Sequence, residues 1–146
     1  MKFNHEKVLN ILRFICLHRS VAGKCTARRT VFVVFFQSIE FVENSNYENK
    51  LGGIINAYTK NGNFPDLSDI DMAIVGVCES RYSANSGSQL APDSVRTYLY
   101  DLYQGSFRAR IVDLGNIEQG HEVDDTYYAL KTTVEYLIKN NIIPII

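Results

Sequence analysis

Three short apolar runs divide the second half of the chain, and two amphipathic stretches separate them. The runs are residues 70–77 (IDMAIVGV), 110–114 (RIVDL) and 142–146 (IIPII). Each is brief and has few polar positions, which is typical of a strand buried on both faces of a parallel sheet. The order strand, helix, strand, helix, strand with short connections predicts a right-handed βαβαβ unit and therefore an α/β fold.

The two amphipathic stretches predict helices with different signals at their ends. Pro92 and Asp93 suit the first turn of one helix, and Gly105 is expected to end it. Its apolar face is predicted from Val95, Leu99 and Leu102. The other helix is expected to begin with Asp124 as its N-cap and to close at Asn140-Asn141. Its apolar face follows a period of 3.6 residues and comprises Tyr127, Leu130, Val134, Leu137 and Ile138.

The preceding part of the chain carries weaker signals. Residues 5–18 place apolar side chains at helical spacing and predict an amphipathic helix, while residues 31–36 (VFVVFF) predict a strand. Residues 43–68 are rich in Asn and Gly and predict loops, with a short helix expected within residues 51–58.

The charge is unevenly distributed, although the net charge of the 146 residues is only -1. Residues 1–36 hold seven basic residues against one acid, Glu6, whereas the remainder is acidic. This split predicts a basic N-terminal extension, residues 1–36, followed by an α/β domain in residues 37–146. With its basic flanks, the helix predicted for residues 5–18 could contact nucleic acid or an anionic membrane. Aromatic interleaving and a binding motif are both missing there, which favours a solvated or disordered extension, so neither a nucleic acid nor a membrane is expected as its partner.

The cysteines and the length of the apolar runs indicate the cellular compartment in which the protein is expected. Cys16, Cys25 and Cys78 form an odd set without a CxxC pair, which is typical of free thiols in a reducing compartment. The longest apolar run, residues 31–36, is too short to span a bilayer, and no secretory signal precedes it. A cytoplasmic protein is therefore expected.

Two motifs in residues 69–146 carry a resemblance to a known family. Residues 91–96 (APDSVR) match a Gly/Ala-Pro-Asp-x-[IV]-Arg helix, and residues 112–117 (VDLGNI) match an x-Asp-x-Gly-[DN]-[IV] strand end. Residues 142–146 are similar to the beginning of an IPIIIGG strand. In this order and spacing the chain resembles the N-terminal part of the arginase, agmatinase and formimidoylglutamase (ureohydrolase) family, most of all its formimidoylglutamase-type members. The resemblance spans roughly residues 37–146 and is weak before residue 69.

The resemblance implies a fold and an activity. The fold is a three-layer α/β/α domain around a mostly parallel sheet, of which this chain would hold only the N-terminal βαβαβ portion. The activity is hydrolysis of a C–N bond in a small amidine or guanidine substrate, by water activated between two manganese ions (Mn2+). The complete enzymes are also expected to be homo-oligomers.

The family's metal ligands come from three segments, and none of them occurs in this chain. They are Gly-Gly-x-His (or Gly-Gly-Asp-His), Asp-x-His-x-Asp and Asp-x-Asp-x-x-Asp, and the first would begin immediately after Ile146. The resemblance therefore implies an N-terminal fragment that binds no manganese and is inactive by itself.

Residues 78–91 are the best candidate for a binding loop, because they follow the first predicted strand at the carboxyl end of the sheet, where α/β active sites gather. In the family, the loop in this position lies beside the active-site mouth. The resemblance thus implies that Arg81 or Asn85 helps to hold a substrate carboxylate, Arg81 by a bidentate pair, with Ser86 and Ser88 as further hydrogen-bonding groups. A solvated loop whose Asn and Gly residues serve turn geometry explains the same sequence equally well.

Roles can also be predicted for four other residues with reactive or charged side chains. His121 lies near acids, but these are better explained as residues that begin a helix. Asp113 is expected to brace a loop, and Arg96 to brace the loop or to pair with Asp93 or Asp101. Cys78 is not expected to act as a nucleophile, because no histidine is near it in sequence.

Two other classes of function remain open. One is a small doubly wound module that binds a ligand or nucleotide, although the loop after the first strand has neither G-x-G-x-x-G nor a Walker A sequence. The other is a non-catalytic interaction protein that uses its basic N-terminus as the contact surface.

Overall fold

The computed structural model describes residues 35–40, 49–85, 87–106 and 108–146. The chain divides into two units, residues 1–34 and 35–146, and all described residues belong to the second unit. The amphipathic helix predicted for residues 5–18 lies outside the described residues, as do Cys16, Cys25 and most of the strand predicted for residues 31–36.

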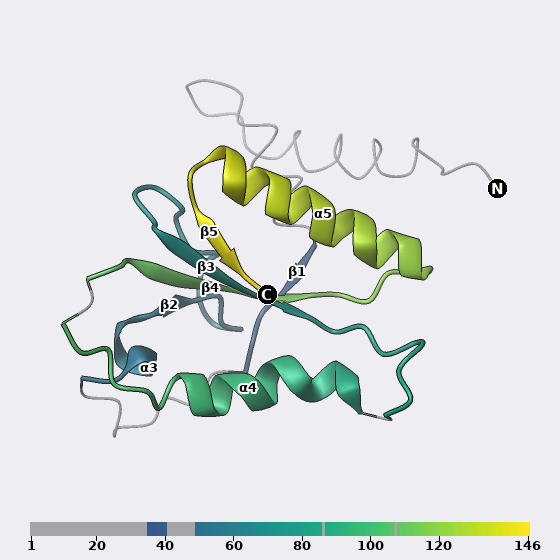
Figure 1. Cartoon of the computed structure of the whole chain (residues 1–146), viewed down its shortest axis with the longest axis horizontal. Coiled ribbons are helices and arrows are strands. Elements are labelled where there is room, and N and C mark those ends of the chain that lie inside the picture. Colours follow the sequence, from purple (N-terminus) through teal and green to yellow (C-terminus); the bar gives the residue numbers. More distant parts are fainter. Residues whose placement is uncertain (1–34, 41–48, 86, 107) are drawn as a thin grey trace. The chain divides into compact units, whose positions relative to one another are not determined.

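A five-stranded, mostly parallel sheet is the centre of the second unit (Figure 1). Its strands are β1 (Phe36–Gln37), β2 (Asn56–Ala57), β3 (Met72–Val77), β4 (Ile111–Ile117) and β5 (Ile143–Ile145). The order is β1-β4-β3-β5, and β2 pairs with β4 off this path. Strands β2, β3 and β5 are parallel to their partners, whereas β1 is antiparallel to β4. The predicted parallel arrangement of the three apolar runs is confirmed.

Strand β4 is longer than the apolar pattern predicted. Pairing with β3 matches Ile74 with Asp113 and Gly76 with Asn116, so two residues of β4 oppose one of β3 in a bulge. Gly115 lies in this bulge with φ +84°, a conformation that glycine adopts without steric cost. The sequence Gly-Asn was interpreted as the end of the strand, but here it continues the strand to Ile117.

The helices are α3 (Leu51–Ile54), α4 (Ala91–Leu99) and α5 (Val123–Lys139). Helices α4 and α5 lie on opposite faces of the sheet (Figure 1), as two right-handed crossovers in opposite directions require. The short helix expected within residues 51–58 is confirmed for its first four residues, whereas β2 in the same range was not predicted. The structure is thus an α/β fold with a mostly parallel sheet.

The predicted ends of the helices were correct only in part. Helix α4 ends at Leu99 rather than near Gly105, which instead has φ +66° in a later turn. Helix α5 has Glu122 as its N-cap rather than Asp124, because the Asp125 carboxylate accepts a hydrogen bond from the Glu122 N–H at 3.0 Å. Asn140 closes α5 as predicted.

The predicted apolar face was wrong for most of α4 and correct in part for α5, where Leu137 is buried and Leu130 and Val134 are half-buried. On α4 the buried residue is Arg96, while Val95 and Leu102 are 60% and 55% exposed. The buried residues of α5 are mostly small and are Thr126, Ala129, Thr133 and Leu137. Tyr127 and Ile138, predicted to be covered, lie in the exposed class. Polar contacts on α4 and small side chains on α5 decide which face meets the sheet.

The apolar core is concentrated on the two central strands. Its largest fully buried apolar side chains are Val75 of β3, Val112, Leu114 and Ile117 of β4, and Leu137 of α5. Strand β5 pairs only with β3 among the described strands, and its Ile143 and Ile145 are exposed. These two side chains are not covered, because β5 lies at the edge of the described sheet.

Candidate functional site

The carboxyl ends of β3 and β4 lie at one edge of the sheet, which is where ligands bind in open α/β folds. Residues 78–90 follow β3, and residues 118–122 connect β4 to α5. These two loops are neighbours because the strands before them are parallel and paired. The Cys78 N–H donates to the Ile117 carbonyl oxygen at 3.4 Å, so the contact continues past the strand ends.

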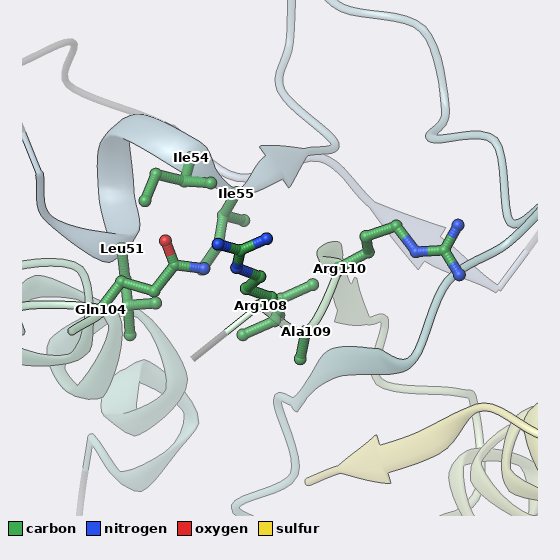
Figure 2. A pocket seen from close by; sticks show the side chains of 8 residues that line it. Leu51, Ile54, Ile55, Gln104, Arg108, Ala109 and Arg110 are labelled. Carbon is green, nitrogen blue, oxygen red and sulfur yellow. The ribbon is translucent and has the colours of Figure 1, made fainter. Parts of the chain in front are cut away.

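A cavity of about 340 Å³ lies at the opposite end of β4 (Figure 2). Its lining includes Ile111, the first residue of β4, and residues of α3. Its position is therefore remote from the carboxyl edge, and it is not a part of the site that the strand ends predict.

A polar group at the carboxyl edge, which we call the edge cluster, comprises Glu79, Arg81, Gln119, His121 and Thr126. Arg81 donates from Nε to Glu79 Oε1 at 2.9 Å and from Nη2 to Oε2 at 2.6 Å, a bidentate ion pair. The Arg81 N–H and Gln119 Nε2 also donate to Oε1, at 2.9 and 3.2 Å. Glu79 thus fixes the first turn of the loop.

Arg81 also joins this loop to the beginning of α5. Its Nη1 donates to the His121 carbonyl oxygen at 2.8 Å, and its Nη2 donates to Thr126 Oγ1 at 3.0 Å. The Thr126 hydroxyl oxygen accepts a further hydrogen bond from the Gly120 N–H at 3.0 Å. One guanidinium therefore connects the loops after β3 and β4 with the first turn of α5.

Hydrogen bonds from the Arg81 side chain hold the pKa of Glu79 well below its ordinary value of 4.5. A carboxyl whose pKa is lowered on folding stabilises the folded state fully above the pKa of the unfolded chain. That stabilisation is lost as the pH falls below 4.5 and through the lower pKa of the folded state.

We expect Arg81→Met to raise the pKa of Glu79 towards 4.5, because the variant removes the donors that favour the carboxylate. An NMR titration of the Glu79 side-chain carboxyl measures this directly. Lys139→Met is the matched control, since it removes a cation 3.9 Å from a different carboxylate, that of Glu135. A Glu79 pKa that stays equally low in Arg81→Met would contradict the role given to Arg81.

The three residues predicted to bind substrate have different places in the loop. Arg81 lies at the carboxyl edge, with its guanidinium engaged in the edge cluster. Asn85 is exposed, and its N–H donates to Ser83 Oγ at 3.2 Å in a local turn. Ser86 lies outside the described residues. Of the three, the structure brings Arg81 into a polar cluster, where its contacts organise the loop.

Three members of the edge cluster were not singled out from the sequence. Glu79 had a local signal, because an acid two positions before an arginine is well placed for an ion pair. Gln119 and Thr126 had no such signal, since their contacts with Glu79 and Arg81 join residues about 40 positions apart.

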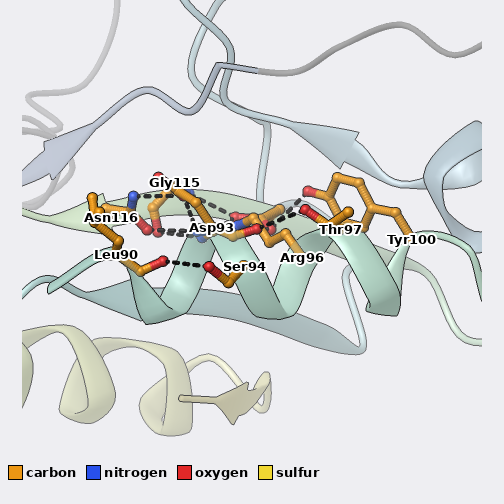
Figure 3. A network of polar contacts seen from close by, with 9 residues as sticks. Leu90, Asp93, Ser94, Arg96, Thr97, Tyr100, Gly115 and Asn116 are labelled. Carbon is orange, nitrogen blue, oxygen red and sulfur yellow. Dashed lines mark hydrogen bonds and ion pairs between the residues drawn. The ribbon is translucent and has the colours of Figure 1, made fainter. Parts of the chain in front are cut away.

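A second polar group, the buried network, lies between α4 and β4 and comprises Asp93, Arg96, Tyr100, Asp113, Gly115 and Asn116 (Figure 3). Arg96 donates to Asp113 from Nε at 2.8 Å and from Nη2 at 2.9 Å. It also donates to the Gly115 carbonyl oxygen at 2.9 Å, to Asp93 at 3.0 Å and to Asn116 Oδ1. These contacts provide an acceptor for each of its five N–H groups.

Asp113 is completely buried and accepts hydrogen bonds from three residues. Besides Arg96, these are the Tyr100 hydroxyl at 2.8 Å and the Gly115 N–H at 2.8 Å. Burial, followed by the nearby Asp113 charge, raises the pKa of Tyr100 above its ordinary value, so the phenol remains a donor. All these contacts lie within the fold, which agrees with a bracing role for Asp113.

The two partners expected for Arg96 had different outcomes. Asp93 is within 3.0 Å of the Arg96 guanidinium, as predicted. Asp101 instead forms an ion pair with Lys50. The difference follows from the helix geometry, because Asp93 and Arg96 are three positions apart and share a face of α4.

Cys78 and His121 show no arrangement for nucleophilic chemistry. Burial raises the pKa of the Cys78 thiol, with a smaller contribution from Asp93, and this disfavours the reactive thiolate. The His121 side chain is 92% exposed, and its Nδ1 lies 3.2 Å from a carboxylate oxygen of Glu122.

Metal-binding groups were sought across the described ranges. Within residues 35–40, 49–85, 87–106 and 108–146, no three side chains of His, Cys, Asp or Glu gather so that they could hold a metal ion.

Comparison of the chain with protein-family models, with curated proteins and with solved structures found no match. The assignment of a mostly parallel α/β fold therefore rests on the strands and helices described above. Among the helices that the structure describes, none is both long and apolar enough to cross a membrane.

Proposed function

We propose that residues 37–146 form the first part of an arginase-like α/β/α hydrolase domain of the formimidoylglutamase type. In the complete enzyme, two manganese ions would activate the water that cleaves a C–N bond of a linear amidine or guanidine. The 146 residues of this chain supply scaffold and a loop beside the substrate, without the metal centre. The observation that carries the proposal is the contact between the two motifs behind the resemblance.

The motifs at residues 91–96 and 112–117 contact each other through the buried network. Arg96 of the first motif bonds to Asp113, Gly115 and Asn116 of the second. Asn116 Nδ2 in turn donates to Asp93 Oδ1 at 3.0 Å. Residues that were selected by pattern alone thus have one shared structural role, which is to join α4 to β4. Two unrelated chance matches would not require this contact.

The end of β3 also depends on the buried network. A Cβ atom at Gly76 would lie 1.9 Å from Asn116 Oδ1 and 2.8 Å from Pro92 Cβ. Glycine is therefore the residue that lets β3, α4 and β4 approach at this point. The carboxyl end of β3, Gly76-Val77, therefore packs against both motifs.

The edge cluster supports a specific role for each described candidate residue. Arg81 is a positioning residue, because its guanidinium holds residues 78–90 against the start of α5. Asn85 lies farther along the same loop and is exposed, so it remains free to approach a substrate. In this proposal the loop borders the substrate side of the complete enzyme.

We expect the purified chain not to hydrolyse formiminoglutamate, arginine or agmatine, with or without added manganese. The reason is that its sequence contains none of the three metal-binding segments of the family. Release of formamide or urea is the measurement, with a complete ureohydrolase as the positive control. Turnover above that of a protein-free blank would contradict this prediction.

The family assignment has a separate test in the DNA that follows the codon for Ile146. An in-frame Gly-Gly-x-His segment followed by Asp-x-His-x-Asp would support the proposal. A continuing frame without these segments would overturn it. Saturable binding of FMN or ATP by the purified chain would instead favour the doubly wound nucleotide-binding module.

A further inference from the structure

We infer that the cavity at the amino-terminal end of β4 binds a small carboxylate that carries an apolar chain. The cavity has a volume of about 340 Å³, which is within the range of about 300–1,000 Å³ typical of small-molecule sites. It lies at the opposite end of β4 from the edge cluster. Its occupation is thus independent of the hydrolase proposed above.

The cavity has an apolar wall and a more polar wall (Figure 2). The apolar wall belongs to α3 and the residue after it, and comprises Leu51, Ile54 and Ile55. The facing wall is the segment that leads into β4, and comprises Gln104, Arg108, Ala109, Arg110 and Ile111. A ligand that fits both walls needs an apolar part and a polar head.

Contacts outside the cavity hold the two walls together. The Leu51 N–H donates to the Leu102 carbonyl oxygen at 2.9 Å, and Lys50 forms an ion pair with Asp101. Strand β2, which follows the apolar wall, pairs with β4, which follows the polar one. The cavity is therefore formed before a ligand binds, which reduces the entropy lost on binding.

Two arginines line the cavity, and none of the described lining residues is acidic. Arg110 is already paired, since its N–H donates to Asp71 at 2.8 Å and its Nε at 3.4 Å. Figure 2 shows the Arg110 side chain extending away from the other lining residues. Of the four arginines in the described residues, Arg108 is the one without a carboxylate partner among them. The cavity therefore offers one guanidinium for an anion.

The chemistry of the lining favours a carboxylate over a phosphate. A guanidinium binds a carboxylate through two parallel hydrogen bonds, and one positive charge matches one negative charge. The Gln104 amide lies beside Arg108 in Figure 2 and adds a further hydrogen-bonding group. An alkyl chain attached to the carboxylate would contact the isoleucines of the opposite wall.

Calorimetric titration of the whole chain with butanoate, hexanoate and octanoate tests the inference. Each methylene that becomes buried is expected to tighten binding about fourfold until the cavity is filled. Hexanol and hexylamine, which have the same chain but no negative charge, are expected to bind at least about tenfold more weakly than hexanoate.

Two variants separate the head group from the chain. Arg108→Gln is expected to weaken hexanoate binding at least about tenfold, whereas Lys131→Gln, on the exposed surface of α5, leaves it unchanged. Ile54 is 51% exposed, so Ile54→Ser should fold normally while it weakens octanoate binding more than butanoate binding.

Three outcomes would overturn the inference. The first is the absence of saturable binding of octanoate to the wild-type chain. The second is hexanol binding as tightly as hexanoate, which would mean that Arg108 does not recognise the head group. The third is an equal effect of Arg108→Gln and Lys131→Gln, which would mean that net charge alone attracts the ligand.

Discussion

Arg96→Met is expected to destabilise this fold by about 3–5 kcal/mol, because it leaves the buried Asp113 carboxylate without its cation. Asp113 has no exposed surface and would retain only the Tyr100 hydroxyl and the Gly115 N–H as donors. Methionine keeps a long unbranched side chain at this position, so the loss of packing is small compared with the loss of the ion pair. The midpoint of urea unfolding measures the effect.

The control for this experiment is an ion pair at the surface. Arg110→Met removes the partner of Asp71, but both side chains are about half exposed. Water screens such pairs, so the midpoint should stay close to that of the wild type. Equal midpoints for Arg96→Met and Arg110→Met would contradict the role of the buried network.

A double variant distinguishes the buried charge from lost packing. Adding Asp113→Leu to Arg96→Met removes the unpaired carboxylate, so part of the lost stability should return. If the double variant is less stable than Arg96→Met by the full effect of Asp113→Leu, the two residues contribute independently, and the buried network does not act as a unit.

The strands of the parallel sheet could be predicted because their apolar runs satisfy a local rule. Residues 70–77 and 110–114 are nearly continuous in apolar character, as strands covered on both faces must be. Strand β2 had no such signal, since Asn56 and Ala57 pair with β4 through backbone groups that any residue carries. Its two residues are ordered by their neighbour rather than by their own composition.

The helix faces were harder to predict, because periodicity assumes that apolar residues face the core. On α4 the opposite happens, since Arg96 turns inward and meets the carboxylate of Asp113. A buried arginine is favourable only when its partners are in place, and all of those partners except Asp93 belong to β4. The pattern of α4 alone cannot report a side chain on another element. Arg96 and Asp113 were each singled out from the sequence, but their contact with each other was not predicted.

The candidate site shows the same division between local and distant contacts. Arg81 was found because it lies in a long loop after a strand, which is a position that topology makes functional. Its hydrogen bond to Thr126 could not be predicted, because this contact depends on how α5 packs against the loop. The cavity beside Arg108 is more distant still from any sequence signal, since α3 precedes the facing wall by about fifty residues.

The central arginines of the buried network and of the edge cluster differ in how deeply they are buried. Each donor of Arg96 has an internal acceptor, so this residue is committed to the scaffold. Arg81 bonds near the surface, where its partner Glu79 is 19% exposed. Arg96 therefore belongs to the buried scaffold, whereas Arg81 holds a half-buried loop through its ion pair with Glu79 and its hydrogen bonds to His121 and Thr126.

Gly115→Ala is expected to destabilise the protein by about 2–5 kcal/mol for two reasons. The φ of +84° disfavours an alanine by about 1–2 kcal/mol. In addition, the new Cβ would lie 2.3 Å from the Gln37 carbonyl oxygen, and overpacking of this kind costs about 1–3 kcal/mol. The obstructing atom belongs to the backbone of β1, so it cannot rotate away as a side chain would.

Gly105→Ala separates the strain from the clash. Gly105 also has a positive φ, +66°, but a Cβ there would meet no described atom within 4 Å. We expect this control to lose only the strain energy, about 1–2 kcal/mol. Hydrogen exchange adds a local measurement, because the Glu118 N–H donates to the Phe35 carbonyl oxygen beside β1 at 3.2 Å. Its protection should fall in Gly115→Ala beyond the global loss of stability. If both variants lose the same stability and Glu118 stays protected, β1 does not approach β4 as closely as this contact requires.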